Sequence, residues 1–481
     1  MIRLGVFLLA TALHAQTMAI TGVNVVDVVT GKVIPGQTVV IAADRIRAMG
    51  PAATAQIPAQ SQTIDGTGYY LIPGLWDMHV HFRSNPVDPD RVLADENAGT
   101  LELFLVNGVV GVREMGGDLS EHVLRWREEI KSGKRVGPRI LTAGRKLDVV
   151  KPAWPGSIST TTPEEGREAV RQMKRAGADF IKVYYGDVEA PVLKAVLSEA
   201  HATGLKVVGH LPRNLSLQTV QELGLDEMEH STLTAPKQAD FDRFAVERQE
   251  RIKAGLAMDT AEMARRLTWM HDADEAKRLY PLMAARPLWV TPTLAVQARV
   301  RYEIAERKFD GDPRKRYIGP AIWASWDPGA GRRKPAAAGL LDLFKQQLKQ
   351  GRQLTAEAHK AGVPILLGTD CGVSNNYMLP GWSVHEELAA LVEAGLTPAE
   401  ALRAATVNPA KWRGELATEG TVEKGKRADL LLLRSNPLTA IAATREVEAV
   451  FLGGAYYPRS KLDAMLDVAE QRVKEAYQRL K

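Results

Sequence analysis

The sequence of 481 residues predicts a mixed α/β fold whose larger part is a parallel (β/α)8, or TIM, barrel. Strand-like segments lie at both ends of the chain, and between them short strand patterns alternate with helical patterns. Eight strand segments can be counted in this central part, which is the number of strands in such a barrel. The first segment ends near His81, and the other seven cover 109–116, 139–144, 179–186, 205–210, 226–231, 288–293 and 364–370.

The segments between these strands have the periodicity and the end signals of helices. PEEGREAVRQMKRAG (163–177) and APVLKAVLSEAHATG (190–204) each end in glycine, the residue that most often follows a helix C-terminus. Two connections are much longer, 232–287 and 294–363, and are rich in Arg, Lys and Gln. Long insertions after barrel strands lie above the active face and often form lids. Structural helices or a homo-oligomer contact would fit the same pattern.

The composition is that of a globular protein, with 25% charged residues and a formal net charge of +5. The basic residues are scattered among acidic ones and no nucleic-acid motif is present, so we expect no nucleic-acid partner. The chain has one cysteine, Cys371, which excludes an intrachain disulfide. Cys371 follows Asp370 directly, and it is either a buried small residue or a thiol that touches the site described below.

The N-terminus, MIRLGVFLLATALHAQT, has the pattern of a secretory signal peptide. Arg3 precedes a short apolar stretch, and Ala15 offers a small-residue cleavage site. The stretch is too short for a convincing membrane span, and no other stretch is apolar for long enough. We therefore expect an exported protein, periplasmic or extracellular, that begins near Gln16 and has no stable membrane anchor.

The stretch LIPGLWDMHVHF, residues 71–82, carries two histidines one residue apart at the end of an apolar strand. Alternate side chains of a strand point to one face, so Asp77, His79 and His81 share a face. Two imidazoles about 6 to 7 Å apart along such a strand can bind one metal ion. The alternative is a pair of exposed or hydrogen-bonded histidines at a strand end.

Other predicted strands carry further metal-competent residues. His210 closes the fifth strand, His230 closes the sixth, Asp370 closes the eighth, and Lys182 lies within the fourth. Active sites of such barrels form at the C-terminal strand ends. Each residue alone could be structural: a histidine that is hydrogen-bonded in the core, or an aspartate that caps a turn. Their shared placement at strand ends indicates a single site.

Lys182 is predicted to point into the barrel. It shares a strand face with Phe180 and Tyr184, while Ile181 and Val183 share the face that packs against the helices. A buried ammonium without a partner is costly. The lysine could pair with an acid, form a Schiff base, or lose its charge in another way. Reaction with CO₂ would make it a carbamate, an anion whose two oxygens can bridge two cations.

These motifs resemble those of the amidohydrolase superfamily, metal-dependent hydrolases on a (β/α)8 barrel. The HxH of DMHVH, the lysine of IKVYY, the histidines of VVGHLP and EMEHST and the aspartate of LLGTD follow the order of that family. Two C-terminal stretches, AGLTPAEALRAATVNPAKW and GTVEKGKRADLLLL, also resemble its signatures. Within the superfamily, the chain is most similar to imidazolonepropionase-related and prolidase-like secreted amidohydrolases.

The resemblance implies a site with two divalent metal ions, usually zinc. It assigns His79, His81 and Asp370 to one ion and His210 and His230 to the other, with carboxylated Lys182 as the bridge. It also implies a small β-sandwich built from both chain ends. The expected division is a signal peptide (1–15), sandwich segments (16–70 and 416–460), the barrel (71–415) and a C-terminal helix (461–481).

The function that follows is hydrolysis of a C–N bond in a small molecule, an amide, cyclic amide or dipeptide, by metal-activated hydroxide. Asp370 would orient the hydroxide, take its proton and deliver it to the leaving nitrogen. Tyr184 and His385, which follows the eighth strand in WSVHEEL, are candidate substrate contacts. Esterase, lactonase or phosphotriesterase activity at the same site is an alternative, and a non-catalytic scaffold is another.

Overall fold

The computed structural model describes most of the chain. The described ranges are 17–82, 92–149, 156–230, 233–256, 260–304, 311–326, 338–372 and 377–480, with residues 152, 154, 258 and 309 between them. The predicted signal peptide, residues 1–15, lies outside the described residues. Within these ranges, none of the helices combines the length and the apolar character that crossing a bilayer requires.

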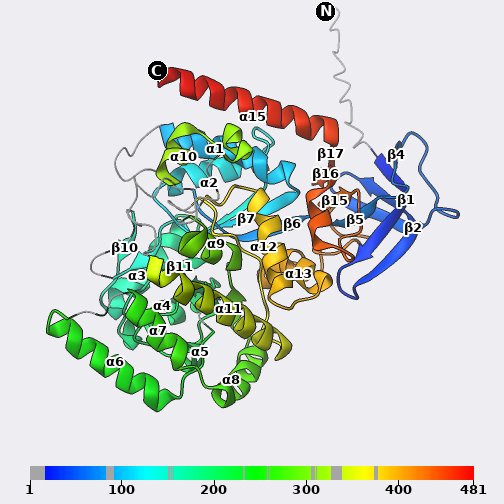
Figure 1. The fold of residues 1–481 in the computed structure, drawn as a ribbon. Coiled ribbons are helices and arrows are strands. Elements are labelled where there is room, and N and C mark those ends of the chain that lie inside the picture. The colour runs from blue at the N-terminus through cyan, green and yellow to red at the C-terminus, as the bar shows by residue number, and fades with distance from the viewer. Residues whose placement is uncertain are drawn as a thin grey trace, which may run out of the picture.

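The two ends of the chain form one eight-stranded sheet with the order β17-β16-β15-β5-β1-β2-β3, in which β4 pairs with β1 (Figure 1). Antiparallel pairing of β15 with β5, with Leu431 opposite Ile72, joins the C-terminal strands to the N-terminal ones. The β unit that was predicted from both chain ends is therefore present as one sheet. The second layer that would make it a sandwich stays a prediction. Its strands are β1 (Thr17–Asp27), β2 (Lys32–Ala42), β3 (Arg45–Pro51), β4 (Gln62–Asp65), β5 (Tyr70–Pro73), β15 (Leu430–Leu433), β16 (Val447–Leu452) and β17 (Ala455–Pro458).

Strand β15, with the sequence LLLL, is buried on both faces. Leu430 and Leu432 belong to an apolar core within the eight-stranded sheet, together with Phe451. Leu431 and Leu433 belong to the large core under the helices. The alternation of side chains along a strand therefore lets one short strand bury apolar surface in both parts of the molecule.

The central part of the chain contains two parallel sheets, β6-β7-β8 and β10-β9-β11-β12-β13-β14. Seven of the eight predicted strand segments appear as strands, and β9 and β10, each of two residues, were not predicted. The bounds are β6 (Leu75–Val80), β7 (Val109–Glu114), β8 (Arg139–Thr142), β9 (Leu147–Asp148), β10 (Ile158–Ser159), β11 (Ile181–Val183), β12 (Val207–Gly209), β13 (Glu227–Glu229) and β14 (Trp289–Thr291).

The eighth predicted strand, 364–370, is extended chain that runs between β14 and β6. The Leu366 N–H donates to the carbonyl of Val290 at 2.8 Å, and the Met78 N–H donates to the carbonyl of Leu367 at 2.9 Å. The segment approaches its neighbours closely, since a Cβ on Gly368 would lie 2.4 Å from a methyl carbon of Thr291. It links the two parallel sheets, although the described strands do not form one closed barrel.

Helices follow most of the parallel strands, and their ends carry the expected signals. Thr162 and Thr397 each form a capping box with a glutamate three residues later, and proline occupies the first turn of both helices. These helices are α1 (Val92–Val106), α2 (Ser120–Lys131), α3 (Pro163–Arg175), α4 (Ala190–Ala202), α5 (Leu217–Leu223), α12 (Trp382–Glu393), α13 (Pro398–Ala405) and α14 (Val407–Arg413).

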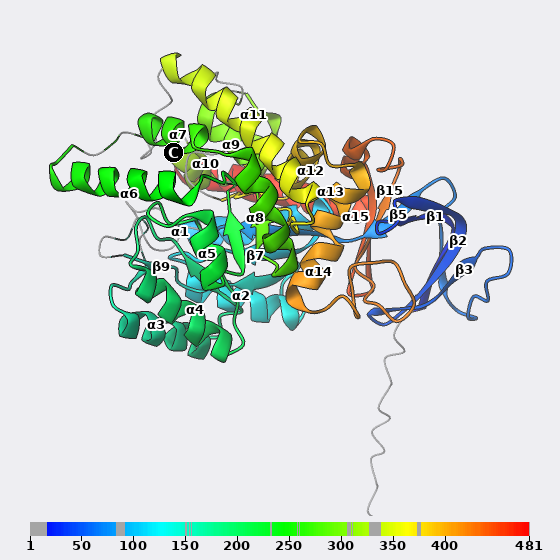
Figure 2. The ribbon, with the colours of Figure 1, turned by 90° about the horizontal axis from the view of Figure 1, so that it is seen from below.

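The two long insertions are largely helical, as predicted, and Figures 1 and 2 show α6 and α7 far from the eight-stranded sheet. The final helix, α15 (Arg459–Arg479), packs against α1. The first insertion holds α6 (Gln238–Lys253), α7 (Thr260–Trp269) and α8 (Ala273–Ala285). The second holds α9 (Leu294–Ala298), the π-helical turn η1 (Arg299–Glu303), the 3-10 turn η2 (Pro313–Tyr317), α10 (Pro320–Trp326) and α11 (Ala338–Lys360).

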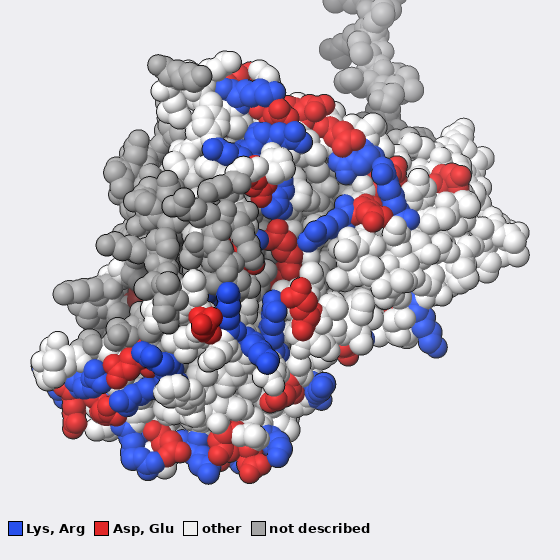
Figure 3. All heavy atoms as spheres, viewed as in Figure 1, with Lys and Arg blue, Asp and Glu red and all other residues white. Residues whose placement is uncertain are grey.

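Basic and acidic side chains alternate over the described surface that Figure 3 shows. Blue and red residues lie side by side on the helices, and the end formed by the eight-stranded sheet is mostly white. This face therefore has no broad basic field of the kind that attracts nucleic acid.

Candidate metal centre

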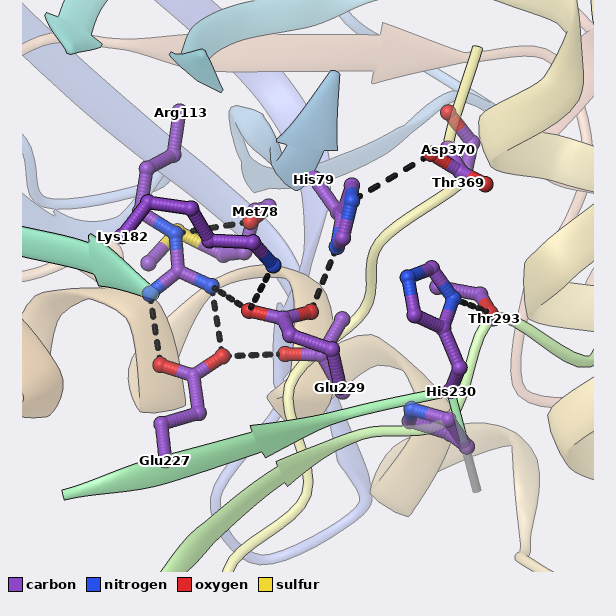
Figure 4. A network of polar contacts seen from close by, with 12 residues as sticks. Met78, His79, Arg113, Lys182, Glu227, Glu229, His230, Thr293, Thr369 and Asp370 are labelled. Atoms are coloured by element: carbon purple, nitrogen blue, oxygen red, sulfur yellow. Dashed lines mark hydrogen bonds and ion pairs between the residues drawn. The ribbon is translucent and has the colours of Figure 1, made fainter. Parts of the chain in front are cut away.

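Three predicted ligands from distant parts of the sequence gather at the carboxyl ends of the parallel strands (Figure 4). His79 lies on β6, His230 follows β13 directly, and Asp370 lies on the segment between β14 and β6. Their ligand atoms all lie within 4.8 Å of one another, close enough to hold one metal ion. The Asp370 Oδ1 atom is 3.3 Å from Nε2 of His79 and 3.3 Å from Nε2 of His81.

The four predicted histidines form a continuous row of rings. The ring centroids are separated by 5.2 Å between His81 and His79, 4.7 Å between His79 and His230, and 4.5 Å between His230 and His210. Tyr184 lies at the end of this row, with its ring centroid 4.2 Å from that of His210. The structure therefore places one of the two predicted substrate contacts, Tyr184, beside the predicted ligands.

Unusual backbone geometry accompanies these ligands. His230, Thr293 and Asp370 have φ angles of 65°, 49° and 56°, in the left-handed region that residues other than glycine seldom adopt. The Thr293 hydroxyl is 2.9 Å from Nδ1 of His230, so a hydrogen bond joins two of these three residues. Such strain is typical of functional sites, where the surrounding structure holds a side chain in a required direction.

Cys371 and Gly372 pack against the backbone of His81, at the end of the first parallel strand. The His81 N–H donates to the carbonyl of Cys371 at 2.8 Å, and a Cβ on Gly372 would lie 1.8 Å from the carbonyl oxygen of His81. Only glycine fits this position. The Cys371 side chain is buried, and burial raises the pKa of its thiol well above the usual value, which keeps it protonated.

Lys182 is fully buried, as its strand face predicted, with 1% of its surface exposed. Its Nζ atom has no hydrogen-bond partner among the described residues, and a carboxylate oxygen, Oε1 of Glu229, lies 3.9 Å away. Burial lowers the pKa of the Lys182 amine, and the charge of Glu229 opposes this effect only in part. Burial thus makes the ammonium form less favourable here than in water.

A buried acid–arginine network that was not predicted from the sequence supports the site (Figure 4). Oε2 of Glu229 lies 2.5 Å from Nδ1 of His79. Arg113 donates to both carboxylate oxygens of Glu227 at 2.5 Å and lies 3.4 Å from Oε1 of Glu229. The Glu229 contact favours a proton on Nδ1 of His79, which leaves Nε2 free to bind a metal ion.

A sequence signal for this network exists. Glu227 and Glu229 alternate along β13, so they share one face of the strand, and both are buried, as is Arg113 on β7. Two acidic side chains on one buried strand face require a basic partner. Pairing them with the arginine of VVGVREMG would have identified the network from the sequence.

The electrostatics favour neutral imidazoles at His81, His210 and His230 and an ionised carboxylate at Asp370. Burial lowers the pKa of His81 and His210 well below the usual value, and it lowers that of His230 to about 3. For His79, burial acts in the same direction, but Glu229 and Asp370 outweigh it and raise the pKa. Burial raises the pKa of Asp370, yet His79 and its neighbours bring it well below the usual value. Neutral imidazole and carboxylate are the forms that bind metal.

The residues present fit a divalent cation. Nε2 of His79 is buried and has no hydrogen-bond partner among the described residues, although it points at Asp370 and His230. Imidazole nitrogens together with a carboxylate oxygen suit zinc and related divalent metals. A cation between these atoms would satisfy a buried nitrogen that otherwise has only the 3.3 Å contact with Asp370.

His385 requires a correction, because the structure does not place it at the site. Its Nδ1 atom lies 3.0 Å from the Thr444 hydroxyl, and its Nε2 atom lies 3.1 Å from the carbonyl oxygen of Asn107. The ring is fully buried on α12, and burial lowers its pKa to about 3. Both ring nitrogens are thus engaged in packing contacts, and the predicted substrate contact at His385 is wrong.

Residues 70–456 match the model of the amidohydrolase family, and the chain belongs to this family. An ochratoxinase from Aspergillus niger is 25% identical over 437 residues, which cover 79% of this chain and 73% of the relative. The family and its hydrolase relatives make this chain a hydrolytic enzyme that acts on carbon–nitrogen bonds.

Solved structures share the fold over nearly the whole chain. A Bifidobacterium longum protein assigned as a prolidase is 26% identical, with a TM-score of 0.66 over 95% of this chain and 99% of that one. Bottromycin amidohydrolase is 22% identical, with a TM-score of 0.69 over 95% of this chain and 90% of that one, a likeness of fold alone. These neighbours imply a TIM-barrel domain for the central part of this chain.

Proposed function

We propose that this chain is a binuclear metal-dependent hydrolase that cleaves an amide, a dipeptide or a cyclic amide, with its site at the mouth of a (β/α)8 barrel. The observation that carries the proposal is the position of Asp370, whose Oδ1 atom lies 3.3 Å from Nε2 of both His79 and His81. A carboxylate held at equal distance from two imidazoles is suited to bind an ion with them.

In this proposal, each predicted ligand has a place. His79, His81 and Asp370 would hold one ion, and His210 and His230 would hold the other. When bound, the ions supply an activated water molecule and polarise the scissile carbonyl. Zinc is the metal that we expect, because the donors are mainly imidazole nitrogens.

Lys182 would bridge the two ions as a carboxylated lysine. Two properties support this role: the amine is fully buried, and its Nζ atom has no hydrogen-bond partner among the described residues. Conversion to a carbamate removes the ammonium charge from the core. It leaves one N–H that can donate to Glu229, whose Oε1 atom is 3.9 Å from Nζ.

Asp370 would move the proton. Its carboxylate is ionised, since the neighbouring imidazoles hold its pKa well below the usual range. It accepts a proton from the attacking water and delivers it to the leaving nitrogen, which makes the amine a better leaving group. Tyr184, beside His210, borders the space that the substrate would occupy.

The relatives favour amides over lactones and phosphotriesters as substrates of this chain. Prolidase and bottromycin amidohydrolase are names for enzymes that act on C–N bonds, and ochratoxinase is a third related hydrolase. The test is a panel of N-acyl amino acids, dipeptides, lactones and organophosphates, offered to zinc-loaded protein. We expect turnover of the amides or dipeptides; turnover of lactones or phosphotriesters alone would contradict the proposal.

A further inference from the structure

A cavity of about 340 Å³ lies beside the candidate metal centre. His230 forms part of its wall, so one predicted ligand borders both the cavity and the row of histidines described above. Leu211 and Leu215, which follow β12, form another part. Its volume falls in the range of small-molecule sites, about 300–1,000 Å³.

Both long insertions contribute the remaining walls. Phe241 of α6, Met263 and Leu267 of α7, and Leu354 of α11 line the cavity with apolar surface. These residues come from helices of two separate insertions, and they line the same cavity as residues that follow β12 and β13. An apolar group placed among them would lose contact with water and bind favourably.

The polar side chains of the cavity are neutral or basic. Arg301 donates to Oε1 of Gln347 at 3.1 Å, and Gln350 donates to the carbonyl of Thr268 at 3.1 Å. Arg213 also lines the cavity, while no aspartate or glutamate does among the described residues. Such a lining accepts neutral or anionic groups and disfavours a cation, because the basic Arg213 would repel it and none of the described lining residues is a carboxylate.

We propose that this cavity is the specificity pocket of the enzyme. It binds a bulky apolar group on one side of the scissile amide, accepts neutral or carboxylate-bearing substrates and rejects cationic ones. The inference rests on the proposed function and deepens it, since it names the substrate class. It also gives the insertions 232–287 and 294–363 a role, because their helices form the walls.

Two substrate series test the proposal with zinc-loaded protein. One varies the acyl group on glycine: acetyl, hexanoyl and phenylacetyl. The other varies the amino acid under an acetyl group: glycine, norleucine, phenylalanine and lysine. We expect kcat/KM to rise about 10-fold or more from the small to the bulky apolar member in one series. N-acetyl-lysine should be at least about 10-fold worse than N-acetyl-norleucine, which has the same chain without the ammonium group.

A filling variant connects this preference to the cavity. Leu267→Trp should raise KM for the preferred bulky substrate about 10-fold or more. Leu256→Trp is the matched control, since Leu256 lies after α6 in the same insertion and is 64% exposed. Met263→Phe, from the same helix, replaces Leu267→Trp if that variant does not fold.

The outcomes separate the pocket from the proposed function. A preference for bulky substrates that Leu267→Trp or Met263→Phe does not change would overturn the pocket, and so would hydrolysis without any preference for size or charge. Calorimetry with N-phenylacetylglycine and metal-free protein measures binding in the absence of turnover. Binding that the filling variant abolishes supports the pocket even if no substrate is hydrolysed, a result that would overturn the proposed function alone.

Discussion

The eight-stranded sheet and the mouth of the parallel strands are both well buried, but they bury opposite kinds of side chain. The sheet encloses an apolar core with residues such as Ile20, Val39 and Phe451. The mouth encloses imidazoles, carboxylates, a lysine and an arginine, several of them with no exposed surface. Burying charged groups is unfavourable unless they are paired or bind a ligand. The contrast indicates that the mouth is built for binding.

The backbone shows the same difference. In the sheet, the non-glycine residues with positive φ are Ala43 and Gln60, both exposed in connections between strands. At the mouth they are His230, Thr293 and Asp370, two of which are predicted ligands. A surface turn tolerates a left-handed residue easily, whereas a strained residue at a strand end persists because its surroundings hold it.

The largest effect on activity is expected from Asp370→Asn. Asparagine keeps the shape and one ligand oxygen but cannot accept a proton, and loss of such a base lowers rate about 10²- to 10⁴-fold. The acidic limb of the pH–rate profile should change as well, since an ionised group has been removed. Substantial kcat with full metal loading would show that another group is the base. A parallel loss of metal would show ligation only, so metal content is measured on the same sample.

Removal of the buried Lys182 amine tests whether this residue bridges the two metal ions. Lys182→Ala should lower both bound metal and activity, because the two ions lose a shared anionic ligand. Short carboxylic acids added to the variant should enter the space and restore part of both. A purified variant that keeps full activity and full metal content would contradict the bridging role. Metal analysis with and without added acetate provides the measurement.

A smaller effect is expected from Glu229→Gln. The carboxylate that contacts Nδ1 of His79 becomes neutral, which reduces the basicity of Nε2, and metal affinity should fall about 10- to 100-fold. Glu227→Gln is the matched control, because Glu227 contacts Arg113 and Thr291 in the same network. Competition with a metal chelator measures both variants. Equal affinities in the wild type and in Glu229→Gln would refute the supporting role.

The smallest effect on activity is expected in the eight-stranded sheet. Phe451 has no exposed surface in the sheet's apolar core. Phe451→Ala should lower the free energy of unfolding by about 3–5 kcal/mol, as for other large-to-small core changes. The metal affinity and kcat of the folded protein should stay unchanged. If folded Phe451→Ala lost metal affinity, the separation between the two regions would be wrong.

The sequence predicted most of the parts that depend on local pattern. Alternation and helix signals located seven of the parallel strands and the insertion helices. Strand ends indicated the four histidines and Asp370, and Lys182 was indicated by the strand face that it shares with Phe180 and Tyr184. The two-residue strands β9 and β10 are too short to produce a periodic signal.

Features that depend on long-range packing were missed or misplaced. His385 follows the eighth strand closely in sequence, but the packing of α12 directs its ring to Thr444 and Asn107. The contact of Glu229 with His79 joins residues 150 positions apart, and the cavity requires both insertions to fold above the mouth. Neither follows from the local spacing of residues.

The metal content of the purified protein is the decisive measurement for a binuclear metal-dependent amide hydrolase. Elemental analysis and amide hydrolysis are measured before chelation, after chelation, and after zinc is returned. We expect about two divalent ions per chain, loss of both metal and activity on chelation, and recovery of both with zinc. Full amide hydrolysis by metal-free protein would contradict this expectation.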